Sequence, residues 1–268
     1  MADGTGTLAG CRPAAGRTGS VRVEHVMGTA VSVSSPERVP EAVLGRVFGW
    51  LHRVDAVYST YRRDSQVSRL RRGELRPSGC AEDVRVVLRL CARLRNLTGG
   101  YFDACVGGRE NLDPSGLVKG WAAERASALL ASAGVRSSVV NAGGDVRLRG
   151  GAGPGRAWRV GIGDPFRPGE LLTVVAGRDV AVATSGTYER GEHVIDPHTG
   201  RPSADLVAVT VIGPSLTWAD AFATAALAMD RSRAAGWLAE LPRYAGLLVG
   251  ADGEARHTPG FARYLALG

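Results

Sequence analysis

A carboxylate and a hydroxyl stand four residues apart in the segment Ala219–Thr224, which reads Ala-Asp-Ala-Phe-Ala-Thr. If this segment is helical, Asp220 and Thr224 lie on the same face. Two hard oxygen ligands so placed suit Mg2+, which prefers oxygen and retains some of its waters. Thr217 and Asp220 also have the spacing of a helix-capping box, so a structural role for Asp220 stays open.

A second candidate segment reads Asp113-Pro-Ser-Gly-Leu-Val-Lys-Gly120. We expect a helix to start here, and free N–H groups at a helix start favour an anion. Gly116 allows backbone to approach a ligand, and its carbonyl could bind a metal. Lys119 is the one lysine in a chain that otherwise uses arginine, and a compact ammonium differs from a guanidinium at a tight site. The alternative is an ordinary surface lysine.

Two histidines lie in the segment His193-Val-Ile-Asp-Pro-His198. Their spacing is not a common zinc pattern, and no cysteine is near. His193 could carry a proton or donate a hydrogen bond to a phosphate, although a buried structural histidine is equally compatible with the sequence. Asp196-Pro197 followed by Gly200 indicates a turn.

Two glycine pairs precede further polar residues. Gly99-Gly100 ends a predicted helix directly before Tyr101, Phe102 and Asp103, whose rings could stack on a flat heterocycle or belong to the core. The stretch 141–145, Asn-Ala-Gly-Gly-Asp, favours a hairpin turn, although its backbone amides could also face a phosphate.

The elements that must position these residues come in blocks. Hydrophobic periodicity predicts helices over 40–54, 82–96, 117–133, 217–229 and 231–240, with a polar loop over 55–64. It predicts strands around 21–23, 31–33, 138–141, 145–149, 157–162, 171–176, 179–183, 206–212 and 244–249. Because helices and strands do not alternate strictly, the fold class is α+β, with residues 20–268 as a single domain.

The composition limits the classes of function. The 268 residues carry a formal charge of +7, but the arginines are scattered and not interleaved with aromatic rings, so we expect no nucleic-acid partner. The positive field favours a polyanionic ligand instead. No apolar run reaches the roughly 18 residues of a membrane span, so we expect no transmembrane segment.

The four cysteines show no metal or redox spacing, which favours a reducing compartment. Leu8-Ala9-Gly10-Cys11 resembles a lipoprotein box but lacks the basic and apolar regions of a signal peptide before it. We therefore expect residues 1–19 to form a disordered tail and the protein to be cytoplasmic.

The order of the motifs is more specific than any one of them. In sequence the motifs are Met27-Gly-Thr29, Ser59-Thr-Tyr61, Gly100-Tyr-Phe-Asp103, Asp113–Gly120, Asn141–Asp145, Thr184-Ser-Gly186, His193–Gly200 and Ala219–Thr224. Across about residues 24–230 this series resembles the ApbE family, the FAD:protein FMN transferases. The resemblance implies an ApbE-like fold with mixed or antiparallel sheets and packed helices.

The resemblance also implies roles. Asp220, Thr224 and the Gly116 carbonyl would hold Mg2+. Catalytic roles fall on His193, Lys119 and Asp220. FAD, the substrate, would lie against Met27, Tyr61, Tyr101, Phe102, Asp103, Asp113, Ser185 and Gly186. The FMN half would move to a Thr or Ser of an acceptor flavoprotein bearing the pattern Asp-x-x-(Ser/Thr)-Gly-Ala-(Ser/Thr), with release of AMP.

This chain departs from the family pattern between Asp103 and Asp113. Nine residues stand where many members have a longer insert, and Ala104 replaces the familiar proline after Phe-Asp. Part of the wall over the cofactor is therefore expected to be rebuilt. Two alternatives remain open, an FAD pyrophosphatase that yields FMN and AMP, and a non-catalytic FAD-binding protein.

Overall fold

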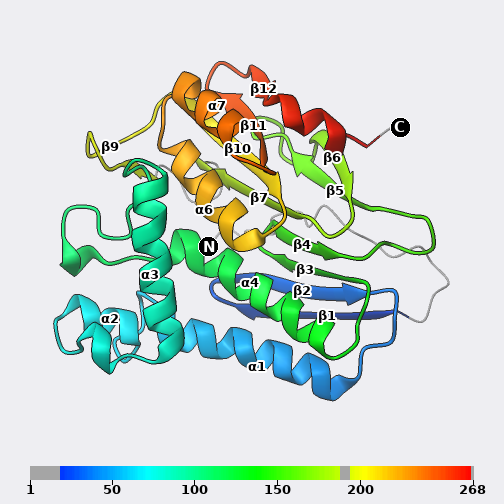
Figure 1. The fold of residues 1–268 in the computed structure, drawn as a ribbon, viewed down its shortest axis with the longest axis horizontal. Helices are drawn as coiled ribbons and strands as arrows, with labels where there is room; N and C mark the ends of the chain where they lie inside the picture. Colours follow the sequence, from blue (N-terminus) through cyan, green and yellow to red (C-terminus); the bar gives the residue numbers. More distant parts are fainter. Residues whose placement is uncertain (1–18, 188–193, 267–268) are drawn as a thin grey trace.

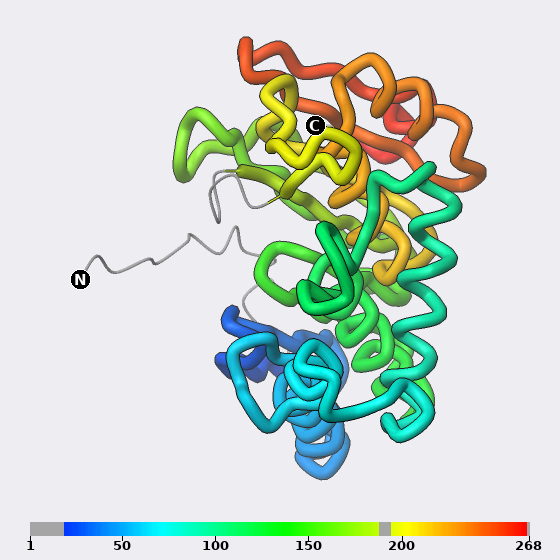
Figure 2. Tube along the Cα trace, turned by 90° about the vertical axis from the view of Figure 1, so that its left-hand side faces the viewer, coloured from blue at the N-terminus to red at the C-terminus, as the bar shows by residue number. Residues whose placement is uncertain are grey.

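The computed structural model describes residues 19–187 and 194–266. Its centre is an antiparallel sheet in the order β1-β2-β3-β4-β7-β10-β11-β12 (Figure 1). The strands are β1 (Ser20–Val26), β2 (Thr29–Ser35), β3 (Ser138–Ala142), β4 (Asp145–Arg149), β7 (Ala181–Gly186), β10 (Leu206–Gly213), β11 (Ala245–Gly250) and β12 (Ala255–His257). Figure 2 shows the early segments (blue and cyan) at one end of the molecule and the last ones (orange and red) at the other.

Helices cover one face of this sheet. They are α1 (Glu41–Tyr58), α2 (Gln66–Arg71), α3 (Glu82–Leu97), α4 (Ser115–Ser132), α6 (Leu216–Leu227) and α7 (Arg231–Glu240). Fully buried side chains from α1, α4 and α6, such as Leu51, Leu117 and Leu216, join strand residues such as Val140 and Val209 in the main core. Burial of these apolar side chains is the dominant stabilising term of such a layer.

The opposite face carries a hairpin of β5 (Trp158–Gly163) and β6 (Leu171–Gly177), with a 3-10 helix at Pro259–Tyr264. Successive strand residues point to opposite faces. Val140 accordingly belongs to the helical core, whereas its neighbour Val139 packs in a small cluster with Trp158. Phe261 fills a third cluster beneath the hairpin. The sheet is therefore buried on both faces.

Helices α4 and α6 approach each other through glycines. A Cβ atom at position 120 would lie 2.6 Å from both the Asp220 Cβ and the Leu216 carbonyl oxygen. A Cβ at position 116 would lie 3.1 Å from Thr224 Cγ2. Residues 116 and 120 are thus spaced four apart on one helix, as Asp220 and Thr224 are on the other, and the two helices run in opposite directions.

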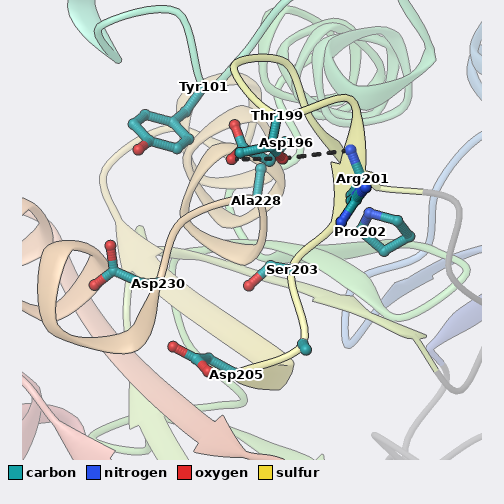
Figure 3. A pocket seen from close by; sticks show the side chains of 10 residues that line it. Tyr101, Asp196, Thr199, Arg201, Pro202, Ser203, Asp205, Ala228 and Asp230 are labelled. Carbon is teal, nitrogen blue, oxygen red and sulfur yellow. Dashed lines mark hydrogen bonds between the residues drawn. The ribbon is translucent and has the colours of Figure 1, made fainter.

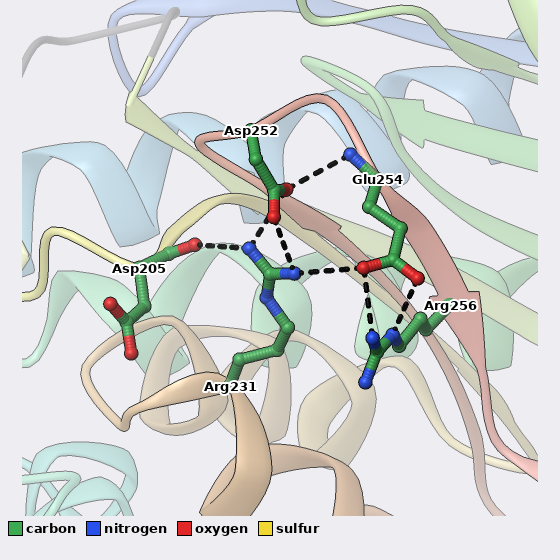
Figure 4. Close-up of polar contacts among 5 residues, drawn as sticks. All are labelled: Asp205, Arg231, Asp252, Glu254 and Arg256. Atoms are coloured by element: carbon green, nitrogen blue, oxygen red, sulfur yellow. Dashed lines mark hydrogen bonds and ion pairs between the residues drawn. The ribbon is translucent and has the colours of Figure 1, made fainter.

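The C-terminal part is tied together by Arg231, the first residue of α7 (Figure 4). Its guanidinium lies 2.8 Å from Asp252 and 3.2 Å from Glu254 in the β11–β12 turn region, and it also donates to the Asp205 carbonyl. Arg256 pairs with the same Glu254 at 2.8 Å. These contacts are solvent-exposed, so each ion pair contributes little to the stability of the fold.

The α+β class is confirmed, and most elements fall where the sequence places them, but two expected boundaries were wrong. The loop over 55–64 begins later, because α1 continues to Tyr58, which is buried against Trp121. Strand β7 extends to Gly186, beyond the strand predicted over 179–183. The capping box that the sequence left open for Thr217 and Asp220 is absent, since α6 begins at Leu216 after Ser215.

The sequence pattern did not predict four short elements, namely α2, β8 (Ile195–Asp196), β9 (Arg201–Pro202) and β12. Within residues 19–187 and 194–266, none of the helices combines the length and apolarity of a membrane span. The tail over 1–19, apart from Gly19, and the Leu8–Cys11 box lie outside the described residues. The single-domain assignment of 20–268 and the cytoplasmic location stay predictions.

The close contact at Gly120 predicts that the same substitution has opposite effects on stability at two helical glycines. Gly120→Ala should lower the free energy of unfolding by about 2 kcal/mol, because the methyl group overpacks the α4–α6 contact. Gly49→Ala on α1 has open space around it and should raise stability by about 0.5–1 kcal/mol through helix propensity. Urea unfolding of both variants measures the difference, and equal effects would contradict the close contact.

Candidate active site

A cavity of about 900 Å3 opens where the loop after α1, the start of α4, the end of β7 and α6 meet. Twelve of the thirteen candidate residues line it. They are Met27, Tyr61, Tyr101, Phe102, Asp103, Asp113, Gly116, Lys119, Ser185, Gly186, Asp220 and Thr224. The thirteenth, His193, lies outside the described residues. Segments nearly 200 residues apart in the sequence thus converge on one cavity.

Asp220 is buried, with 4% of its surface exposed, and its Oδ2 accepts a hydrogen bond of 2.7 Å from the Gly120 N–H. In a regular α-helix that N–H donates to the carbonyl of Gly116, so Asp220 competes with that carbonyl for the same donor. One turn further, Thr224 Oγ1 lies 3.2 Å from Ser185 Oγ. Gly116, Asp220 and Thr224 therefore meet at the α4–α6 contact.

These donors fit a small hard cation. All of them are oxygens, as Mg2+ requires, and the glycine at 116 allows the close packing, since a Cβ there would lie 3.1 Å from Thr224 and 3.4 Å from Phe102. Among the described residues no group of three or more His, Cys, Asp or Glu side chains could hold a metal. A site of one carboxylate, one hydroxyl and one carbonyl does not need such a cluster.

Lys119 projects from the first turns of α4 toward β4. Its Nζ lies 2.8 Å from Oδ2 of Asp145, whose side chain is 1% exposed. The other oxygen of Asp145 accepts a hydrogen bond of 3.1 Å from the Thr184 N–H. The lysine is therefore no freely rotating surface residue, because a buried carboxylate fixes its ammonium beside the cavity.

Asp145 itself ends the hairpin turn over 141–145. Gly143 and Gly144 have φ of +60° and +96°, and Asn141 accepts a hydrogen bond of 2.9 Å from the Gly144 N–H. The favoured interpretation of this segment as a turn is therefore correct. A second glycine-containing turn, with Met27 at φ +56° and Gly28 at φ +71°, joins β1 to β2 and brings Met27 to the cavity.

The aromatic residues divide between core and cavity wall. Phe102 is 4% exposed and belongs to the main core. Tyr101 is half-buried, packs edge-on against His198 at 4.6 Å between ring centroids, and lies 5.6 Å below the Arg233 guanidinium. Tyr61 is 96% exposed at the rim. An aromatic side chain this exposed is free to cover a ligand.

Two of the candidate carboxylates also organise their own loops. Asp103 lies 3.0 Å from Arg95 and accepts a hydrogen bond of 2.8 Å from the Cys105 N–H. Asp113 accepts one of 2.9 Å from the Ser115 N–H at the start of α4. Burial, followed by the charge of Asp103, raises the pKa of the Cys105 thiol, so this thiol is a poor nucleophile at neutral pH.

The short segment after Asp103 closes on itself. The Asp113 N–H donates to the Ala104 carbonyl at 2.7 Å, and Asn111 donates to the Val106 carbonyl at 3.1 Å. Gly107 and Gly108 have φ of +77° and +137°, in the region that favours glycine. Val106 and Asn111 both line the cavity. The nine residues therefore still form a wall.

Sequence reasoning missed Tyr58, which the expected loop concealed. Its ring lines the cavity, while its hydroxyl is buried and has no hydrogen-bond partner among the described residues. Burial, followed by the charge of Asp83, raises the pKa of this hydroxyl. The signal was available, because Tyr58 continues the spacing of Leu51 and Val54 along α1.

A second, smaller pocket of about 480 Å3 adjoins the first, and Tyr101 lines both. It lies beside the hairpin of β8 (Ile195–Asp196) and β9 (Arg201–Pro202) and the start of α7 (Figure 3). Asp196 accepts bonds from His198 and Thr199 within the turn, and Asp230 caps α7 through the Arg233 N–H. These two carboxylates hold the loop geometry, and the turn expected at 196–200 is present.

One protein-family model matches most of the chain. The model of the ApbE family matches residues 27–112 and 108–248. The chain belongs to the ApbE family. The matched residues contain the whole described cavity lining, including the short segment between Asp103 and Asp113.

Several curated relatives of this ApbE chain are named FAD:protein FMN transferase. The one from Vibrio cholerae is 28% identical over 240 residues, 68% of this chain and 72% of the relative. The one from Rhodobacter capsulatus is 42% identical over 122 residues, 42% of this chain and 23% of the relative. The one from Escherichia coli K12 is 35% identical over 148 residues, 52% of this chain and 41% of the relative.

Solved structures support the ApbE fold. The flavin transferase ApbE of Vibrio cholerae superposes with a TM-score of 0.81 at 24% identity, covering 92% of this chain and 99% of that chain. The ApbE protein of Thermotoga maritima gives 0.80 at 24% identity, covering 93% and 100%. At this identity the likeness concerns the fold.

The Lys119–Asp145 pair yields a stability prediction. Lys119→Ala should lower the free energy of unfolding by about 2–3 kcal/mol, because the buried Asp145 carboxylate loses its cationic partner. Adding Asp145→Asn should restore part of the loss, since asparagine keeps an oxygen for the Thr184 N–H without the charge. Denaturant unfolding of the single and double variants measures these free energies. Unchanged stability of Lys119→Ala would indicate that Lys119 is an ordinary surface residue.

Proposed function

We propose that this protein transfers the FMN half of FAD to a Thr or Ser hydroxyl of an acceptor flavoprotein and releases AMP. The observation that carries the proposal is the convergence of twelve motif residues on one cavity. Support comes from membership of the ApbE family and from the names of the relatives. A cavity of about 900 Å3 is at the upper end for small-molecule sites, as a dinucleotide needs.

Asp220, Thr224 and the Gly116 carbonyl would hold Mg2+ in this proposal, because these three residues meet at the α4–α6 contact, line the cavity and offer oxygen ligands. A bound Mg2+ would stabilise the negative charge that accumulates on the pyrophosphate as it breaks. Asp220 is better suited to this ligand role than to that of a general base, since a metal-bound carboxylate is weakly basic.

The side chains of the chain itself supply binding and orientation. The Lys119 ammonium, fixed by Asp145, and the N–H groups at the start of α4 would bind phosphate oxygens and hold the FMN phosphorus in line with the incoming hydroxyl. Tyr101 and Tyr61 would cover the heterocycles, and Phe102 would limit the access of water. His193 stays a predicted proton carrier.

The bond changes follow from this arrangement. The acceptor hydroxyl oxygen attacks the FMN phosphorus, and the bond between that phosphorus and the bridging oxygen breaks. AMP leaves with the bridging oxygen, and the hydroxyl proton is released. If water replaces the acceptor, the same steps give free FMN, so an FAD pyrophosphatase is the second candidate. A non-catalytic FAD-binding protein is the third.

The first experiment separates these candidates. Purified protein is incubated with FAD and Mg2+, with and without a candidate acceptor bearing the expected Asp-x-x-(Ser/Thr)-Gly-Ala-(Ser/Thr) pattern. AMP release and acceptor mass are followed. We expect the acceptor to gain the mass of FMN in step with AMP. AMP with free FMN and no need for acceptor would instead establish the pyrophosphatase, and bound FAD without AMP for several acceptors would indicate a binding protein.

Removing a proposed ligand should abolish the reaction while the fold survives. Asp220→Asn should lower the rate of AMP release by roughly 100-fold or more at fixed Mg2+, because a charged oxygen ligand is lost. Ser215→Ala at the start of the same helix is the control, since Ser215 makes no side-chain capping bond within the described residues. Full activity in Asp220→Asn would remove Asp220 from the metal site.

A further inference from the structure

Glu124 on α4 makes contacts that none of the roles above uses. Its Oε2 accepts a hydrogen bond of 2.6 Å from the Leu216 N–H, at the first residue of α6. Its Oε1 accepts one of 2.9 Å from Arg147 Nε and lies 3.5 Å from Arg149 Nη2. One carboxylate thus connects α4, α6 and β4.

The contact with Leu216 completes a regular pattern between the two helices. Gly116, Gly120 and Glu124 follow each other at intervals of four on α4. Facing them on α6, at the same interval but in the opposite direction, are Thr224, Asp220 and Leu216. The first contact is steric, and the second combines close packing with the hydrogen bond from the Gly120 N–H to Asp220. The third is a hydrogen bond to the first residue of α6, which limits how far one helix slides along the other.

Helix α6 depends on this bond because Ser215, its N-cap residue, makes no side-chain capping bond within the described residues. The Leu216 N–H is one of the donors that a helix start leaves without an intrahelical partner. Glu124 supplies the acceptor and places negative charge at the positive end of the α6 dipole. Asp220 follows one turn later and Thr224 two turns later.

The carboxylate of Glu124 is itself held in place. Arg147 is 5% exposed and also donates to the Leu148 carbonyl at 2.8 Å, while Arg149 donates to Ser127 Oγ at 2.7 Å. Both arginines lie on β4, two residues apart and so on the same face of the strand. Because these two arginines on β4 fix the Glu124 carboxylate, the sheet determines where the first residue of α6 lies.

We propose that Glu124 is a positioning residue for the divalent cation. It holds α6 at the axial position where the Asp220 and Thr224 oxygens face the Gly116 carbonyl. This inference rests on the proposed function. Because Mg2+ demands near-ideal octahedral geometry, a small slide of α6 weakens the binding of the cation more than it weakens the fold.

Two double variants isolate the hydrogen bond to Leu216. Glu124→Gln with Arg147→Met keeps an oxygen acceptor for the Leu216 N–H, whereas Glu124→Leu with Arg147→Met does not. The Arg147→Met change is common to both and removes a guanidinium that would otherwise stay buried without its carboxylate. Leu238→Ala, a buried α7 residue in the main core, is the control for a general loss of stability.

The readout is Mn2+ binding to the full chain by electron paramagnetic resonance, alongside urea unfolding. We expect the glutamine variant to bind Mn2+ within about threefold of Arg147→Met, and the leucine variant to bind it roughly 10–100-fold more weakly, as for other changes behind a metal ligand. If the leucine variant fails to fold, Glu124→Asp, which keeps the charge but shortens the reach, should show weaker Mn2+ binding with nearly unchanged stability.

Four outcomes would overturn the inference. Equal Mn2+ affinity of the two double variants would make Glu124 a structural residue only, as would normal affinity of Glu124→Asp. An equal loss in Leu238→Ala would attribute the effect to stability. Absence of Mn2+ binding in the unaltered protein would remove the metal site and this role together, whereas Mn2+ binding without FMN transfer would refute the proposed reaction and leave the positioning role intact.

Discussion

The close approach of α4 and α6 is the constraint on which the site depends. Two glycines four residues apart allow it, because a methyl group at position 120 would collide with Asp220 and with the Leu216 carbonyl. At that separation a backbone N–H of α4 becomes the hydrogen-bond partner of the Asp220 carboxylate. A buried carboxylate without such a partner would be strongly unfavourable, so the glycines make the acidic residue possible.

Strand β4 packs against the same pair of helices. Asp145, Arg147 and Arg149 alternate with apolar residues and face the helical layer. Asp145 meets Lys119 and Arg147 meets Glu124, so two ion pairs of opposite polarity join the strand to α4. Reversing either sign would place like charges together in a partly buried layer, which fixes the register of helix and strand.

A short, self-closed segment forms part of the cavity wall. The segment between Asp103 and Asp113 closes through the bond from the Asp113 N–H to the Ala104 carbonyl, which brings its two ends together. Its glycines supply the backbone conformations for the tight path. Access to the cavity is therefore shaped by local closure of the wall and by the exposed ring of Tyr61 at the rim.

Much of the architecture is encoded locally. The α+β class, the long helices with their buried stripes, and the glycine turns at 27–28 and 141–145 follow from periodicity and turn chemistry, because these act over a few residues. The order of short motifs also identifies the family, since family-specific spacing is a property of the chain.

The surroundings of each candidate site residue were decided only by tertiary structure. The sequence does not show that Asp220 lies beside Gly120 or that Lys119 lies beside Asp145. Glu124 has no local signature at all. The physical reason is that contacts between residues tens of positions apart in the chain depend on how the helices pack on the sheet. Hydrophobic periodicity and turn propensity act over only a few residues and do not specify that packing.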